Sequence, residues 1–207
     1  ADAKRHGISI LTPDINESET DFTILSENLI RFGLGAIKGV GQIAIDSVLQ
    51  SRREKGPFTD LFDLCSRTNN RTVNKKALEC FAKAGAMDSF GVNRASLFAA
   101  IDEALTLGAS LQKSMDDAQP SFADLLGGDD STFQQRNVTY PNEKPWPKLQ
   151  ELKYEKDTIG IYLTGHPLDD FKKETEQFTT ANISQCHQLT SAREVFLGVS
   201  IVSLREI

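Results

Sequence analysis

The sequence predicts a mainly α-helical chain with a small β segment at its start. Three observations predict this fold class: short apolar runs bounded by turn residues before Phe32, apolar residues at helical spacing after it, and glycine-rich stretches between the predicted helices. The chain has 207 residues, of which 39% are hydrophobic and 25% are charged. This composition is near the globular average, so a packed core in one or two domains is expected.

The β segment is predicted from residues 8–11, an apolar run that a Thr-Pro-Asp turn closes. Two further runs, 21–25 and 29–32, are separated by the polar residues 26–28. Short alternating runs with polar turns between them are typical of paired strands. We therefore expect a small antiparallel sheet.

Four helices are predicted between residues 42 and 112. The first has Ala44, Ile45, Val48 and Leu49 on one face and ends at a Gly-Pro pair, and the second covers about residues 59–67. Asn74 and Asn93 are suited to cap the third and fourth helices, because an asparagine side chain can accept a hydrogen bond from a free amide of the first turn.

The rest of the chain is predicted to change character twice. Residues 113–145 are rich in polar residues and predict a flexible linker. A helix is expected from Trp146 until the Gly-His-Pro sequence at 165–167, and another near Phe171 and Phe178. Residues 194–204 predict a strand, and the first seven residues predict the end of a helix.

The charge is unevenly distributed along the chain. The formal net charge is −6, which argues against nucleic-acid binding if it is taken as a whole. Between Arg31 and Phe98, however, eleven basic and six acidic residues leave +5, and the remainder of the chain carries −11. This asymmetry predicts a module that faces an anion within an otherwise acidic chain.

The sequence Lys38-Gly39-Val40-Gly41 directly precedes the first helix and predicts a helix-hairpin-helix motif. Glycines permit a tight hairpin, and amides at the start of the next helix have no partner in that helix, so they can bind a phosphate. The alternative is a glycine turn that serves only helix packing. The residues predicted to contact a DNA backbone are Lys38, Gly39, Val40, Gly41, Arg52, Arg53, Lys75, Lys76 and Arg94.

A second hairpin is predicted at residues 84–91, between the third and fourth helices. It makes the arrangement tandem, but it lacks a Gly-x-Gly core. The carboxylate of Asp88 would repel a phosphate. Contact with DNA and a purely structural repeat both remain open for this hairpin.

Several separated sequences resemble the C-family replicative DNA polymerases of bacteria. They are residues 31–41, 13–16, 56–58, 61–63, 74–79, 84–86 and 160–168. The resemblance implies the end of a fingers region at 1–33, a tandem helix-hairpin-helix domain at 34–112, a linker at 113–145, a helical connector at 146–192 and the first strand of an OB-fold at 193–207. It also implies a DNA-directed DNA polymerase, a nucleotidyltransferase of the bacterial cytoplasm, whose catalytic aspartates and Mg²⁺ belong to a palm that this sequence does not include.

The resemblance further implies a peptide that binds the sliding clamp after the tandem domain. Residues 119–126 occupy the corresponding place, with Gln119, Phe122, Leu125 and Leu126 as the candidate contacts. Pro120 and the order Phe122-Ala123 depart from the family's peptide. A linker with a few apolar residues is the alternative.

No catalytic residue and no catalytic metal ligand is predicted within the chain. The adjacent aspartate pairs are expected to be solvated, and the three cysteines are expected to be reduced thiols. Hairpins of this type suggest a K⁺ or Na⁺ ion on the carbonyl side of the first hairpin. The sequence leaves two other functions open: a scaffold that only joins neighbouring domains, and a base-excision glycosylase, for which Asp46 lies too early in the helix. No membrane-spanning segment is predicted.

Overall fold

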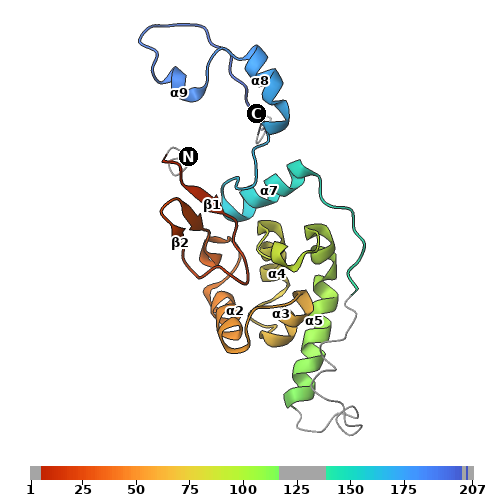
Figure 1. Cartoon of the computed structure of the whole chain (residues 1–207). Coiled ribbons are helices and arrows are strands. Elements are labelled where there is room, and N and C mark those ends of the chain that lie inside the picture. The colour runs from red at the N-terminus through yellow and green to blue at the C-terminus, as the bar shows by residue number, and fades with distance from the viewer. Residues whose placement is uncertain (1–5, 117–138, 202–203, 205–207) are drawn as a thin grey trace. The chain divides into compact units, whose positions relative to one another are not determined.

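The computed structural model of this chain describes residues 6–116, 139–201 and 204. By its contacts the chain divides into two compact units, Ala1–Leu163 and Thr164–Ile207. The first unit contains a small sheet and most of the helices, as labelled in Figure 1. The mainly α-helical fold with a small β segment is confirmed.

The sheet of the first unit has three strands, β1 (Ser9–Leu11), β2 (Thr23–Ser26) and β3 (Leu29–Arg31), in the order β1-β3-β2. β2 and β3 form an antiparallel pair, as expected. β1 pairs with β3 in parallel, so the prediction of a wholly antiparallel sheet was wrong. The reason is topological: the long connection from β1 to β2 crosses over, so β1 lies on the side of β3 that β2 leaves free.

Side-chain caps set the beginnings of two predicted helices. The Asn74 side chain accepts a hydrogen bond from the Ala77 amide, and the Asn93 side chain accepts one from the Ser96 amide, both as the sequence predicted. The helices of this unit are the 3-10 turns η1 (Leu34–Ala36) and η2 (Asp88–Phe90) and the α-helices α2 (Gln42–Lys55), α3 (Leu61–Arg67), α4 (Lys75–Ala84), α5 (Arg94–Asp116) and α7 (Lys148–Ile159).

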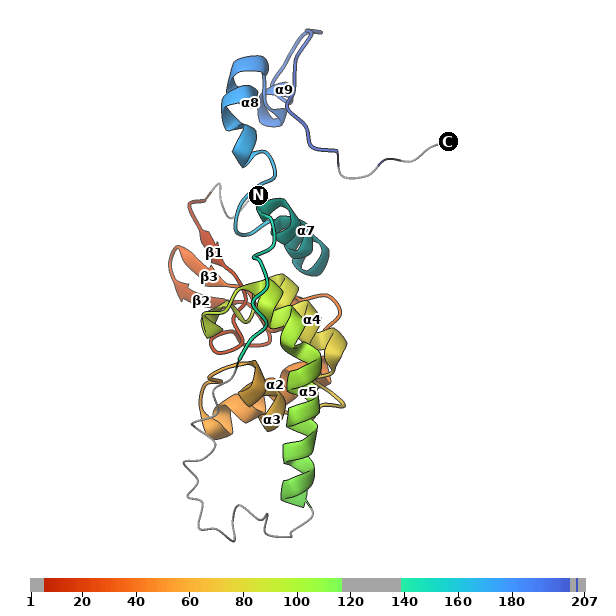
Figure 2. The same cartoon turned by 90° about the vertical axis from the view of Figure 1, so that its right-hand side faces the viewer.

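The core of the first unit forms where α5 packs against α3 and α4, and where α7 packs against α4 (Figure 2). The fully buried side chains include Leu64, Leu78, Phe81, Leu97 and Ile101. Cys65 is buried with them, and this burial raises the pKa of its thiol to about 12. Cys65, Cys80 and Cys186 are all free thiols.

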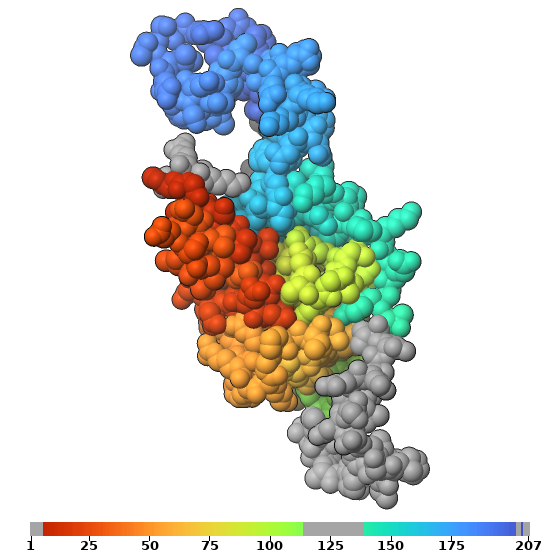
Figure 3. All heavy atoms as spheres, in the orientation of Figure 1, coloured from red at the N-terminus to blue at the C-terminus, as the bar shows by residue number. Residues whose placement is uncertain are grey.

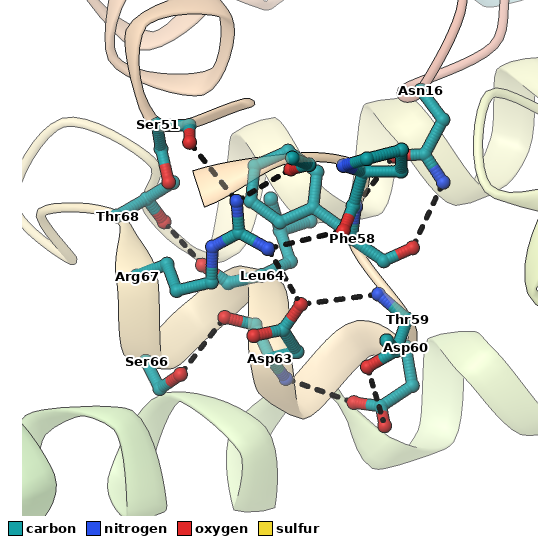
Figure 4. Close-up of polar contacts among 12 residues, drawn as sticks. Asn16, Ser51, Phe58, Thr59, Asp60, Asp63, Leu64, Ser66, Arg67 and Thr68 are labelled. Atoms are coloured by element: carbon teal, nitrogen blue, oxygen red, sulfur yellow. Dashed lines mark hydrogen bonds and ion pairs between the residues drawn. The ribbon is translucent and has the colours of Figure 1, made fainter. Parts of the chain in front are cut away.

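The junction between α2 and α3 is held by the side chain of Arg67. Its guanidinium donates to the carbonyls of Ser51, Gly56 and Pro57 and pairs with the Asp63 carboxylate (Figure 4). The same guanidinium lies 4.3 Å from the centre of the Phe58 ring. Bidentate and stacked contacts of this kind suit arginine and fix the end of α2 against α3.

Helix α7 ends earlier than the sequence predicted. Gly160 adopts a left-handed conformation with φ 90° and caps the helix after Ile159, so the expected extension to residue 163 was wrong. By its contacts α7 belongs to the first unit. In Figure 3 the region around the second hairpin (yellow-green) adjoins both the β segment (red) and the segment that contains α7 (green-blue).

The second unit contains the 3-10 turn η4 (Asp169–Phe171), α8 (Lys172–Phe178) and the short helix α9 (Ile183–Cys186). α8 confirms the helix predicted near Phe171 and Phe178. The strand predicted at 194–204 is not formed in the described part of that range. A strand needs ladder hydrogen bonds from a neighbour. The described residues here supply one backbone–backbone bond, from the Thr180 amide to the Phe196 carbonyl, and one from the Phe196 amide to the Thr180 hydroxyl.

Candidate nucleic-acid interface

The first hairpin, residues 37–41, lies between η1 and α2 in the first unit. Gly39 has φ 88°, a left-handed conformation that favours glycine. A Cβ atom at this position would lie only 2.8 Å from the Cys80 sulfur on α4. Backbone conformation and space therefore both require glycine, and the hairpin packs closely on α4.

The start of α2 is open to a ligand. Its N-cap residue is Gly41, which offers no side chain to the free amides of the first turn. Within the described residues, the amides of Gly39, Gly41, Gln42 and Ile43 have no hydrogen-bond partner. These amides lie at the positive end of the helix dipole, so together they form a site suited to an anion such as phosphate.

Two lysines lie beside these amides. Lys38 is exposed, and the Lys76 side chain runs along Gly39, with its Cε 3.8 Å from where a Cβ of Gly39 would stand. Neither lysine forms an ion pair with any residue that the structure describes. Their charges are therefore available to an external anion.

The amide contacts predicted for Lys38 and Val40 need correction. The Lys38 amide donates to the Thr158 carbonyl of α7 at 2.8 Å, and the Val40 amide makes a long contact of 3.4 Å with the Ile37 carbonyl. Lys38 can thus contribute its side chain but not its amide. The amides of Gln42 and Ile43 take their place, and the signal for them in the sequence was the absence of a capping residue before Gln42.

Arg52 was predicted to bind DNA, but the structure turns it inward. Its guanidinium donates to the carbonyls of Ile15 and Ser18 and to the Glu19 carboxylate, and its side chain is only 11% exposed. Arg52 therefore ties α2 to the segment between β1 and β2. Exposed Arg53 pairs with the same Glu19 carboxylate.

Arg94, also predicted to contact DNA, is turned inward as well. Its guanidinium binds Asp88 through Nε and Nη2 and Glu155 of α7 through Nη1, and its side chain is 8% exposed. Burial acts to lower the pKa of Arg94, but the bonds to Asp88 and Glu155 outweigh it, so the pKa is raised. Lys75 remains exposed and pairs with Asp102 of α5.

The second hairpin, residues 85–91, has much of its backbone bonded internally. Its Gly85 and Ala86 amides donate to α4 carbonyls, and the Ala86 carbonyl accepts from the Ile15 amide. Asp88 adds a negative charge, as the sequence indicated. Of the two possibilities left open, the geometry favours the structural repeat.

Comparison with known proteins places this hairpin arrangement in a family. Residues 7–97 match the helix-hairpin-helix motif. The chain is 34% identical over 89% of its length to the DNA polymerase III subunit alpha of Vibrio cholerae, and 38% identical over its full length to that of Bacillus subtilis. The chain is related to one segment of the bacterial DNA polymerase III α subunits. It spans 16% of the length of the Vibrio protein and 18% of the Bacillus protein.

The other predictions for this chain concern a clamp-binding peptide, metal sites and membrane-spanning segments. The candidate clamp contacts Gln119, Phe122, Leu125 and Leu126 lie outside the described residues. Across residues 6–116 and 139–201, no three His, Cys, Asp or Glu side chains are grouped so that they could hold a metal ion. None of the helices described is long and apolar enough to cross a membrane.

Proposed function

We propose that the chain binds the sugar-phosphate backbone of duplex DNA without reading its sequence, as part of a replicative DNA-directed DNA polymerase. The open start of α2 carries this proposal. Four amides there have no partner among the described residues, the Lys76 side chain runs along Gly39, and Lys38 belongs to the same hairpin. Backbone amides and lysines hold phosphates but carry no information about bases. The catalytic aspartates and Mg²⁺ of the polymerase reaction would belong to other parts of the longer protein.

The proposal extends to the partners of the longer protein. The resemblance to DNA polymerase III α subunits supports association with the other subunits of the holoenzyme in the bacterial cytoplasm. It also supports a sliding-clamp contact through residues 119–126. These partners are proposals for the chain as a part of the polymerase and do not depend on the hairpin.

A K⁺ or Na⁺ ion at the first hairpin is part of the same proposal. The carbonyls of Lys38, Gly39 and Val40 accept no hydrogen bond from the described residues. Carbonyl oxygens suit hard cations. A monovalent ion there would bring positive charge towards the same phosphate that the amides bind.

The test is the binding of the 207-residue chain to a short duplex, followed by fluorescence anisotropy at about 50 and 200 mM salt. Lys38→Ala should weaken binding to all duplex sequences equally and reduce the salt slope by about one unit. Lys55→Ala is the matched control, because it removes the same charge from the opposite end of α2. Repeating the titration with tetramethylammonium in place of K⁺ tests the cation, since the larger ion cannot enter a carbonyl site.

A scaffold is the second candidate function, and the inward turn of Arg52 and Arg94 favours it. A scaffold that joins neighbouring domains requires no contact with DNA. Absence of binding at low salt, or equal losses for Lys38→Ala and Lys55→Ala, would favour the scaffold over the DNA-binding function.

A further inference from the structure

Helix α7 contacts both hairpins of the first unit. The Thr158 carbonyl accepts the Lys38 amide of the first hairpin at 2.8 Å. One turn earlier on the same helix, Glu155 pairs with Arg94, which holds Asp88 of the second hairpin. A single helix therefore links the candidate phosphate site at the first hairpin to the second hairpin.

The contact between α7 and Lys38 is favourable for two reasons. Thr158 lies in the last turn of α7, where carbonyls have no partner within the helix, so the Lys38 amide satisfies one of them. The Lys38 ammonium lies beside Gly160, 3.5 Å from where a Cβ of that glycine would stand. This places it near the negative end of the α7 dipole.

Glu155 anchors α7 at this position. Its side chain is fully buried (0% exposed), and its two oxygens accept from Arg94 at 3.2 Å and from the Leu163 amide at 3.3 Å. A buried carboxylate is tolerated only with partners, so the helix cannot shift without a large loss. Ile159, one turn further on, is buried in the core.

We infer that Glu155 is a positioning residue for DNA binding: through α7 it holds the Lys38 amide and so fixes the orientation of the first hairpin. This inference rests on the proposed function for its consequence at the DNA, but its structural part is independent of DNA. It assigns to α7 a role in the phosphate site that residues 34–112 alone would lack.

The structural part is tested by amide hydrogen exchange in the free 207-residue chain. Glu155→Gln should accelerate exchange at Lys38 by about tenfold, since glutamine removes the charge that pairs with Arg94 and leaves one acceptor oxygen where Glu155 uses two. Asp157→Asn is the matched control, because Asp157 is exposed on the same helix and loses the same charge. Unchanged exchange at Lys38 in Glu155→Gln would overturn the inference.

The functional part is tested by duplex affinity in the same variants. Glu155→Gln should weaken binding by about fivefold, whereas Asp157→Asn should leave it unchanged or strengthen it, because removal of a negative charge favours approach to DNA. Equal losses in Glu155→Gln and Asp157→Asn would contradict a positioning role.

Trp146 provides the check on folding. It is the single tryptophan of the chain and packs edge-to-face against Phe98 of α5 and Tyr154 of α7. If its emission shows that Glu155→Gln releases α7 altogether, Arg94→Lys replaces it, because this change keeps the charge but loses the forked contact. In Arg94→Lys the Lys38 amide should exchange faster and the affinity for duplex DNA should fall. A change in only one of these two quantities, or in neither, overturns the inference. If the unmodified chain binds no duplex, the proposed function fails while the exchange result still decides the role of Glu155.

Discussion

The first hairpin leads into α2 from Gly41, whereas the second leads into α5 from Asn93. Gly41 offers no side chain to the first turn of its helix, and the amides of Gln42 and Ile43 have no partner among the described residues. At the second hairpin the Asn93 side chain accepts from the Ser96 amide. The same helical order thus produces one open helix start and one that is capped.

The two hairpins also differ in charge. Lys38 lies in the first hairpin and Lys76 lies beside it, and neither forms an ion pair within the described chain. The second hairpin contains Asp88, whose carboxylate is bound to Arg94, and Arg94 is bound in turn to buried Glu155. Of the two hairpins, the one suited to an anion is therefore the one whose next helix lacks a capping side chain and which contains no carboxylate.

The largest expected effect comes from breaking the closed hairpin with Arg94→Met. The change leaves Glu155 buried without its charged partner, so the free energy of unfolding should fall by about 3–5 kcal/mol. Urea denaturation followed by circular dichroism measures it. Arg71→Met is the control, since exposed Arg71 forms no ion pair within the described residues and should cost at most about 0.5 kcal/mol. Equal losses in the two variants would show that the contacts of Arg94 with Asp88 and Glu155 do not hold the second hairpin.

A smaller effect should follow from closing the open hairpin with Gly41→Asn. Gly41 has an extended conformation and free space around its Cβ position, so asparagine fits there without strain. The new side chain should cap α2 and raise the free energy of unfolding by a few tenths of a kcal/mol.

The same change should weaken duplex binding by about threefold, because the asparagine oxygen competes with phosphate for one amide. Urea denaturation and anisotropy measure the two effects. Unchanged DNA affinity together with the expected gain in stability would show that the free amides at the start of α2 do not bind phosphate.

Local features of the sequence predicted the parts of the fold that depend on neighbouring residues. Asn74 and Asn93 cap helices as expected, since a cap acts within one turn. The end of α7 is also encoded locally, at Gly160, although the Gly-His-Pro sequence further on is the more conspicuous stop signal. The choice between two stop signals depends on packing, which places Ile159 in the core.

The features of the candidate site that could not be predicted from the sequence depend on residues far apart in the chain. The sequence alone predicts Arg52 and Arg94 to be surface charges, because their partners Glu19 and Glu155 lie 33 and 61 residues away in the chain. A count of charges along the sequence treats every basic residue as exposed. The pairing of the Lys38 amide with α7 was hidden for the same reason.

The most direct test of the open hairpin is a titration of the ¹⁵N-labelled chain with a short duplex, followed through backbone amide shifts. We expect the largest shifts at Gly39, Gly41, Gln42 and Ile43, and only small shifts at residues 85–91. Shifts confined to the second hairpin, or binding that leaves the four open amides unchanged, would contradict the assignment of the phosphate site to the start of α2.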